Sequence, residues 1–198
     1  MKLDSTGVDA ALSALAAQLS RLTRKPVELV VCGGSALEAL GLVDRTTKDI
    51  DVLAVADMVG GQLQLGSADP LPGPVLEAAG IVARDLELPS DWINPGPTDL
   101  LREGLPNGLT DRLQSRRYGD TLVVHFIGRF DQAYAAINGG AAYHLADLRA
   151  LGPSSAEMLE AGRWCLTQDA SEVFPSLVRS FLEKVGYADV ARELDTRG

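Results

Sequence analysis

Apolar residues recur at helical spacing near the start of the chain. The members of this pattern are separated by four, three, four and three positions: Val8, Leu12, Leu15, Leu19 and Leu22. That spacing predicts one apolar face of a helix over residues 8–22. The next apolar run, VELVVC over residues 27–32, is rich in β-branched residues and ends at Gly33-Gly34, so it predicts a buried strand followed by a turn.

The remaining pattern predicts a mixed first part and a helical end. We expect strands at residues 49–55 and 121–127, and helices at residues 35–42, 75–88, 130–138, 141–151, 155–168 and 171–185. The first of these helices opens with Ser35 and has Glu38 three positions later, the pattern of a capping box. Residues 60–73 are rich in glycine and proline and predict a surface loop, and residues 91–120 are poorly patterned. This order predicts an α+β fold, a small mixed sheet flanked by helices. We expect a core over residues 1–128 and a helical region packed on it over residues 129–198, with one single domain as the alternative.

The composition is that of an ordinary folded soluble protein, with 46% hydrophobic and 23% charged residues. Eighteen Lys and Arg against 27 Asp and Glu give a formal charge of −9, which disfavours a broad nucleic-acid-binding surface but permits a local basic cleft. Cys32 and Cys165 lie in apolar surroundings, which indicates reduced thiols. No segment has the pattern of a signal peptide or a membrane span, so we expect a cytoplasmic protein without membrane contact.

The stretch VVCGGSALEALGLVDRTTKDIDVLAV carries the candidate chemistry. Gly33, Gly34 and Ser35 join a predicted strand to a predicted helix, where glycines let a phosphate approach the backbone. The same three residues also make an ordinary turn and helix start, so they are weak evidence alone.

Two aspartates at the start of the second predicted strand strengthen that interpretation. Strand side chains alternate, so Asp49 and Asp51 share one face while Ile50 and Val52 share the other. Two neighbouring carboxylates repel each other, and Mg²⁺ is a hard cation that binds one or two carboxylates together with substrate phosphates. The alternative is an exposed strand start with two solvated aspartates.

GGS, a short helix and then DxD on a strand resemble the signature of the polymerase-β-type nucleotidyltransferase superfamily. The form GGSALEALGLVDRTTKDIDV and the later RFDQ…YHLADLRAL are most similar to its bacterial toxin-like branch, which includes the abortive-infection nucleotidyltransferases of type IV toxin–antitoxin systems. The resemblance implies a minimal nucleotidyltransferase fold. It implies Mg²⁺-dependent transfer of a nucleoside monophosphate from an NTP to a tRNA or protein acceptor, by a toxin with a cognate antitoxin.

The resemblance also implies roles for particular residues. Asp49 and Asp51 would hold Mg²⁺, and Asp147 in HLADLRAL would complete the catalytic set. Nucleotide-binding roles are implied for the glycine turn and the loop before the strand: Gly33, Gly34, Ser35, Arg45, Thr47 and Lys48. From the residues alone, Asp147 could equally be a helix-surface acid, and Arg45 and Lys48 could be solvated loop charges.

The chain departs from this family at two places. The third strand, TLVVHFI, carries His125 where polymerase-like members add a third carboxylate, and a packed core histidine competes there with a catalytic base. The following segment, FDQAYAAIN over residues 130–138, holds no lysine, although toxin-like members place one there. Two alternatives therefore stay open: a nucleotidyltransferase acting on a small molecule, and a weakened enzyme that serves as a binding or regulatory protein.

Overall fold

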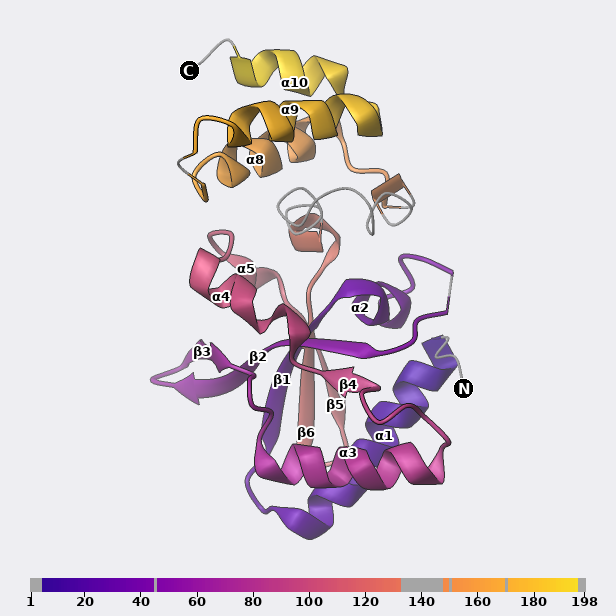
Figure 1. Cartoon of the computed structure of the whole chain (residues 1–198). Coiled ribbons are helices and arrows are strands. Elements are labelled where there is room, and N and C mark those ends of the chain that lie inside the picture. The colour runs from indigo at the N-terminus through magenta and orange to yellow at the C-terminus, as the bar shows by residue number, and fades with distance from the viewer. Residues whose placement is uncertain (1–4, 45, 133–147, 150, 170, 196–198) are drawn as a thin grey trace. The chain divides into compact units, whose positions relative to one another are not determined.

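The computed structural model describes residues 5–44, 46–132, 148–149, 151–169 and 171–195. The chain divides into two units, Met1–Gly128 and Arg129–Gly198. The first unit holds the strands and the second holds helices (Figure 1). This mixture confirms the predicted α+β class.

The first unit is built on a mixed sheet of six strands. They are β1 (Val27–Cys32), β2 (Ile50–Val59), β3 (Gln62–Ser67), β4 (Ile93–Asn94), β5 (Gln114–Tyr118) and β6 (Leu122–Phe126). Their order is β3-β2-β1-β6-β5, and β4 pairs with the start of β2. The pairs β1–β6 and β2–β4 are parallel, and the other neighbours are antiparallel.

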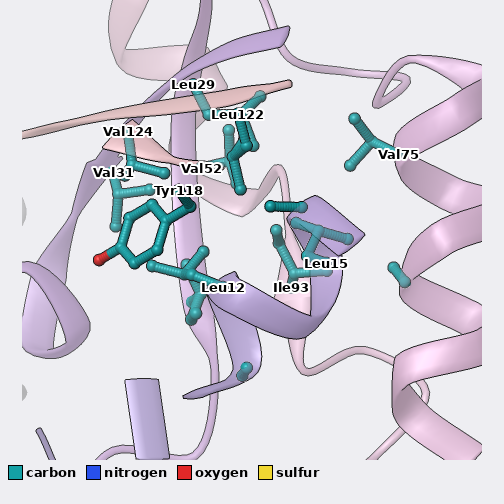
Figure 2. Close-up of a cluster of buried hydrophobic side chains, with 14 of the residues drawn as sticks. Leu12, Leu15, Leu29, Val31, Val52, Val75, Ile93, Tyr118, Leu122 and Val124 are labelled. Atoms are coloured by element: carbon teal, nitrogen blue, oxygen red, sulfur yellow. The ribbon is translucent and has the colours of Figure 1, made fainter. Parts of the chain in front are cut away.

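Two helices close one face of this sheet. The apolar side of α1 (Ser5–Leu22) and that of α3 (Gly73–Asp85) pack against alternate residues of the central strands. Figure 2 shows this core, in which Leu12, Leu15 and Val75 approach side chains such as Leu29 and Val124. Trp92, fully buried, donates its indole N–H to the Ala79 carbonyl at 3.1 Å, as expected for a core tryptophan.

The opposite face carries a smaller apolar cluster. It contains Val30, Cys32, Leu53, Ala54 and Ile127. Residues of the short helices α4 (Leu100–Glu103) and α5 (Leu109–Arg112) and of the segment between them pack with it, and η1 (Gly96–Asp99) directly precedes α4. Both faces of β1 are therefore buried, which explains its uninterrupted apolar run. Polar groups on this second face lie beside that cluster and form the sites described below.

A β-bulge decides which face the aspartates take. Val30 pairs with Ala54 and Val31 with Val52, so Leu53 is an extra residue between them. Uninterrupted alternation from Val55, which packs on the helix-covered face, would turn Asp51 into the same core. The bulge instead places Ile50 and Val52 in that core and turns Asp51 to the second face.

The predicted loop over residues 60–73 is wrong in part. Residues Gln62–Ser67 form β3, which pairs with β2 through a tight turn at Gly60 and Gly61, whose φ angles are 59° and 82°. Two successive positive φ angles suit a type I′ hairpin, so these glycines close a hairpin instead of marking a loop. The sequence did not predict β5, because QSRRY has no alternation of apolar and polar residues. Arg116 and Tyr118 are the side chains of this strand that pack against the fold.

The second unit contains α8 (Ser155–Cys165), α9 (Phe174–Val185) and α10 (Ala188–Asp195). Their buried residues form a separate core around Met158, Leu182 and Val190. The predicted helices at 155–168 and 171–185 correspond to α8 and α9, while those at 130–138 and 141–151 lie largely outside the described residues. Among the described residues, no helix combines the length and apolarity needed to cross a bilayer.

Candidate functional site

The structure brings the two aspartates to the edge of the second face. Asp49 directly precedes β2 and Asp51 is its second residue, and both are half-buried, whereas Ile50 between them is fully buried. The predicted alternation at this point is therefore confirmed. Two carboxylates consequently share one partly desolvated surface.

Asn94 lies between these carboxylates, and sequence reasoning missed it. Residues Ile50 and Asp51 pair in register with Ile93 and Asn94 of β4. The Asn94 Nδ2 group donates to Asp49 Oδ2 at 3.5 Å and to Asp51 Oδ1 at 3.3 Å. Asn94 Oδ1 accepts the Gly96 N–H at 2.9 Å, and this bond orients the amide. A two-residue strand before Pro-Gly-Pro gives little sequence signal, which explains the omission.

Gly33 closes the site from the other side. Cys32 pairs with Asp51, and Gly33 follows it with a φ of 69°. A Cβ placed on Gly33 would lie 2.7 Å from Asp51 Oδ2, closer than such atoms approach each other. Only glycine therefore suits both the backbone angle and the contact with the carboxylate. The turn from β1 into α2 (Gly33–Ala39) is thus fitted to Asp51.

The electrostatics of the site favour an added cation. Burial raises the pKa of Asp51 above its usual value, the negative charge of Asp49 raises it further, and the hydrogen bond from Asn94 opposes both. Burial, and then the charge of Asp51, also raise the pKa of the Cys32 thiol, which therefore stays protonated at neutral pH. A bound cation would offset the negative charges of Asp49 and Asp51, which add to burial in raising both pKa values.

The donor set suits a hard divalent ion. The two carboxylates supply oxygen ligands, and Mg²⁺ commonly uses one or two carboxylates and completes its shell with water and substrate phosphate. No group of three or more His, Cys, Asp or Glu side chains within metal-binding reach occurs in the part of the chain that the structure describes. The pair fits an ion shared with a phosphate substrate.

The other predicted site residues lie in different surroundings. Ser35 is fully buried and donates its hydroxyl to the Cys32 carbonyl at 3.3 Å, and Gly34 is buried beside it. Thr47 is buried and donates to the Asp49 carbonyl at 3.2 Å, which ties the loop to the strand start. Lys48 is exposed. Arg45 and Asp147 lie outside the described residues.

The predicted capping box of α2 is wrong. The helix begins at Gly33, with Cys32 as the preceding cap residue, and no side chain caps its first N–H groups. Ser35 sits in the first turn and bonds back to the Cys32 carbonyl, so it cannot act as the cap. A surface hollow of about 450 Å³ lies beyond this helix, lined by Glu38, Gly41, Leu42, Val43 and Asp44.

The arginines near residue 115 do not form one basic patch. Arg116 pairs with Asp9 at 3.3 Å, and its guanidinium lies 5.6 Å from the centroid of the Phe126 ring. Arg112 donates to the Asn107 carbonyl at 2.9 Å, whereas Arg117 is exposed. Two of the three charges therefore serve the fold, which supports the expectation of a limited basic surface.

Comparison with known proteins adds no assignment to these observations. No family model, no curated protein and no solved structure matches the chain.

Proposed function

We propose that this chain is a magnesium-dependent nucleotidyltransferase that moves a nucleoside monophosphate from an NTP to an acceptor hydroxyl. The observation that carries the proposal is the contact between Gly33 and the carboxylate of Asp51, beside Asp49 and Asn94. This contact places the turn between β1 and α2 directly beside the paired carboxylates, where the ion and the donor phosphates would meet. The sequence resemblance supports the same reaction.

The residues of the chain have separable tasks in this proposal. Asp49 and Asp51 would hold Mg²⁺, which supplies charge neutralisation to the triphosphate. Gly33 has no side chain and so leaves room for the carboxylate of Asp51, and the exposed Lys48 can meet a phosphate from the preceding loop. Thr47 fixes the backbone at Asp49, so the carboxylate pair is positioned before substrate arrives. Catalysis would then rest on positioning and electrostatics rather than on a protein nucleophile.

We further propose a cytoplasmic toxin with a tRNA or protein acceptor and a cognate antitoxin. This finer assignment rests on the toxin-like form of GGSALEALGLVDRTTKDIDV alone. Expression in a bacterial host should slow growth, and Asp51→Ala should restore it. Equal growth with both proteins would contradict the toxin assignment but would not bear on the transferase reaction.

The transfer reaction is tested with NTPs labelled at the α-phosphate. Each is incubated with the full chain, Mg²⁺ and either total RNA, total protein or small hydroxyl compounds, and the labelled species is identified. We expect label in one acceptor class with the native chain and a loss of about 100-fold or more with Asp51→Asn. Asp57→Asn is the matched control, because Asp57 lies on the same strand but pairs with Lys25 at 2.8 Å on the surface. Equal transfer by Asp51→Asn and the native chain would overturn the proposal.

A binding or regulatory protein is the second candidate, and Asn94 favours it. Its amide nitrogen already bridges Asp49 and Asp51 and partly satisfies their charge without a metal. In that case nucleotide would bind with no label transferred to any acceptor. Binding without transfer in the same assay distinguishes the two candidates.

A further inference from the structure

A second polar cluster lies on the same sheet face and is independent of the aspartates. His125 is buried on β6, and its ring contacts two neighbouring strands through both nitrogens. Nδ1 lies 2.7 Å from Ser115 Oγ on β5, and Nε2 lies 2.9 Å from Glu28 Oε2 on β1. We call these three residues the histidine cluster.

The register of the strands holds this cluster in place. Ser115 and His125 are direct cross-strand partners in an antiparallel pair, so their side chains share one face. His125 is in turn paired with Val30 of β1, and Glu28 lies two residues earlier on that strand and on the same face. The three side chains thus come from three adjacent strands of one rigid sheet.

The hydrogen bonds fix the chemical roles of the two ring nitrogens. A carboxylate oxygen accepts hydrogen bonds and does not donate them, so Nε2 carries the ring proton and donates it to Glu28 Oε2. Nδ1 is then a free acceptor, and Ser115 donates its hydroxyl proton to it. A serine hydroxyl bonded to an imidazole nitrogen, in a ring that a carboxylate orients through its other nitrogen, is the arrangement that activates serine as a nucleophile.

Access distinguishes the three groups. The His125 side chain is 9% exposed and that of Glu28 is 22% exposed, whereas Ser115 is exposed on β5, the last strand in the sheet order. The base and its carboxylate are therefore shielded while the hydroxyl faces solvent. Arg117, two residues along β5 and on the same face, is also exposed and has no side-chain partner among the described residues. Its guanidinium is a donor for a developing oxyanion.

We propose that Ser115 is an activated nucleophile that attacks carboxylic esters. Its Oγ forms a bond to the ester carbonyl carbon while the hydroxyl proton passes to His125 Nδ1. The C–O bond to the leaving alcohol then breaks, and that alcohol takes the proton from Nδ1, which leaves an acyl-serine. Water attacks this acyl group, gives one proton to Nδ1, and Ser115 Oγ leaves and recovers that proton, so that ester and water become acid and alcohol.

The reaction is tested on the full chain with a fluorophosphonate probe and with p-nitrophenyl acetate. Mass spectrometry of the labelled protein should place the probe on Ser115, and Ser115→Ala should lose it. Ser155→Ala is the matched control, because Ser155 is an exposed serine bonded to a carboxylate, Asp189 Oδ2 at 2.9 Å, without an imidazole. Labelling should proceed in that variant as in the native chain.

The partners of Ser115 decide whether it is activated or merely hydrogen-bonded. We expect His125→Gln, which keeps a hydrogen-bonding side chain of similar length, to slow labelling about 100-fold. Glu28→Gln should slow it about 10-fold or more, because the ring loses its orienting charge. Removal of Mg²⁺ should leave the labelling rate unchanged, which separates this proposal from the transferase.

Thermal unfolding is measured for every variant so that a rate is compared only between folded proteins. If His125→Gln does not fold, Glu28→Gln carries the comparison, because its side chain is partly exposed and keeps its length. No labelling of the native chain, or labelling of Ser115 at the native rate in a folded partner variant, would overturn the proposal.

Discussion

Two polar clusters on one face of the same sheet have opposite electrostatic character. In the aspartate site, formed by Asp49, Asp51 and Asn94 beside Gly33, two like charges are held together, and burial raises the pKa of Asp51. In the histidine cluster, each charged or polar group has a complementary partner on the next strand. In our proposal a cation completes the first cluster, whereas the groups of the second cluster pair within the protein.

The difference shows how buried neighbours can hold two repelling carboxylates close together. Trp92, Ile50 and Ile93 are buried below the aspartates and fix β2 and β4 in register. The backbone thus holds the two carboxylates together even though they repel each other, as expected for a ligand site. The same sheet gives the histidine cluster pairs that stabilise the strands they join.

Gly33→Ala should produce the largest effect and break the aspartate site by crowding. The added Cβ meets Asp51 Oδ2 at 2.7 Å on a backbone with a φ of 69°. We expect the free energy of unfolding to fall by about 3 kcal/mol, from backbone strain plus overpacking. Gly41→Ala is the control, because Gly41 has a φ of 67° but nothing within 4 Å of its added Cβ. Chemical denaturation should show a smaller loss there, about 1–2 kcal/mol; equal losses would contradict the close contact at Asp51.

Asn94→Asp should sharpen the comparison, because it increases the negative charge of the aspartate site. The change removes the Nδ2 donor that bridges Asp49 and Asp51 and adds a third negative charge. We expect a loss of about 1–2 kcal/mol in the free energy of unfolding without Mg²⁺, and its recovery on adding Mg²⁺. The control is Asn107→Asp in an exposed loop, which should respond to neither. A stability of Asn94→Asp that ignores Mg²⁺ would argue against an ion at this place.

Neutralising one carboxylate in each cluster should give effects of opposite sign. A carboxyl with a folded-state pKa above its unfolded value costs stability as pH rises through the unfolded value, and the full cost remains above the folded pKa. Asp51→Asn removes that cost, so we expect it to raise the free energy of unfolding at pH 7 without Mg²⁺, on the order of 1 kcal/mol. Below a pH of about 4 the gain should vanish, because the native carboxyl is then protonated in both states.

Glu28→Gln should instead lower the free energy of unfolding at pH 7 by about 1 kcal/mol, because it removes the charged acceptor of His125 Nε2. The two variants are compared by urea denaturation in one buffer without divalent ions. A loss of stability in both would show that the aspartate pair is compensated within the protein, and the contrast between the clusters would disappear.

Lys48→Ala should have the smallest effect on stability and separate binding from folding. Lys48 is exposed and has no side-chain partner among the described residues. We expect a change within about 0.5 kcal/mol in the free energy of unfolding. NTP binding should nevertheless weaken a few-fold if Lys48 meets the triphosphate. Lys25→Ala, which removes the exposed partner of Asp57 toward the other end of β2, should leave that binding unchanged. An NTP affinity of Lys48→Ala equal to that of the native chain would show that Lys48 does not contact the triphosphate.

The sequence predicted the parts of the fold whose signal is local. Helical spacing identified α1, β-branched runs identified β1, β2 and β6, and alternation placed Asp49 and Asp51 on one face. Elements stabilised mainly by their neighbours were missed. The polar strand β5 depends on pairing with β6, and β3 depends on the Gly60-Gly61 hairpin, whose glycines also fit an open loop.

The candidate site was predictable in its charges but not in its geometry. Neither the register between Asp51 and Asn94 nor the bulge at Leu53 has a local sequence signal, because both depend on strands distant in the chain. The same reason hid the histidine cluster. In the sequence His125 is an isolated histidine within a predicted strand, because its partners Glu28 and Ser115 are 97 and 10 residues away along the chain.

Calorimetric titration of each NTP, with and without Mg²⁺, tests the central claim most directly. The native chain, Asp51→Asn and the surface control Asp57→Asn are titrated under the same conditions. The aspartate site predicts that at least one NTP binds the native chain and the control only when Mg²⁺ is present, and that Asp51→Asn loses this binding by about 100-fold. NTP binding that is the same without Mg²⁺ and in Asp51→Asn, or the absence of NTP binding to the native chain, would contradict it.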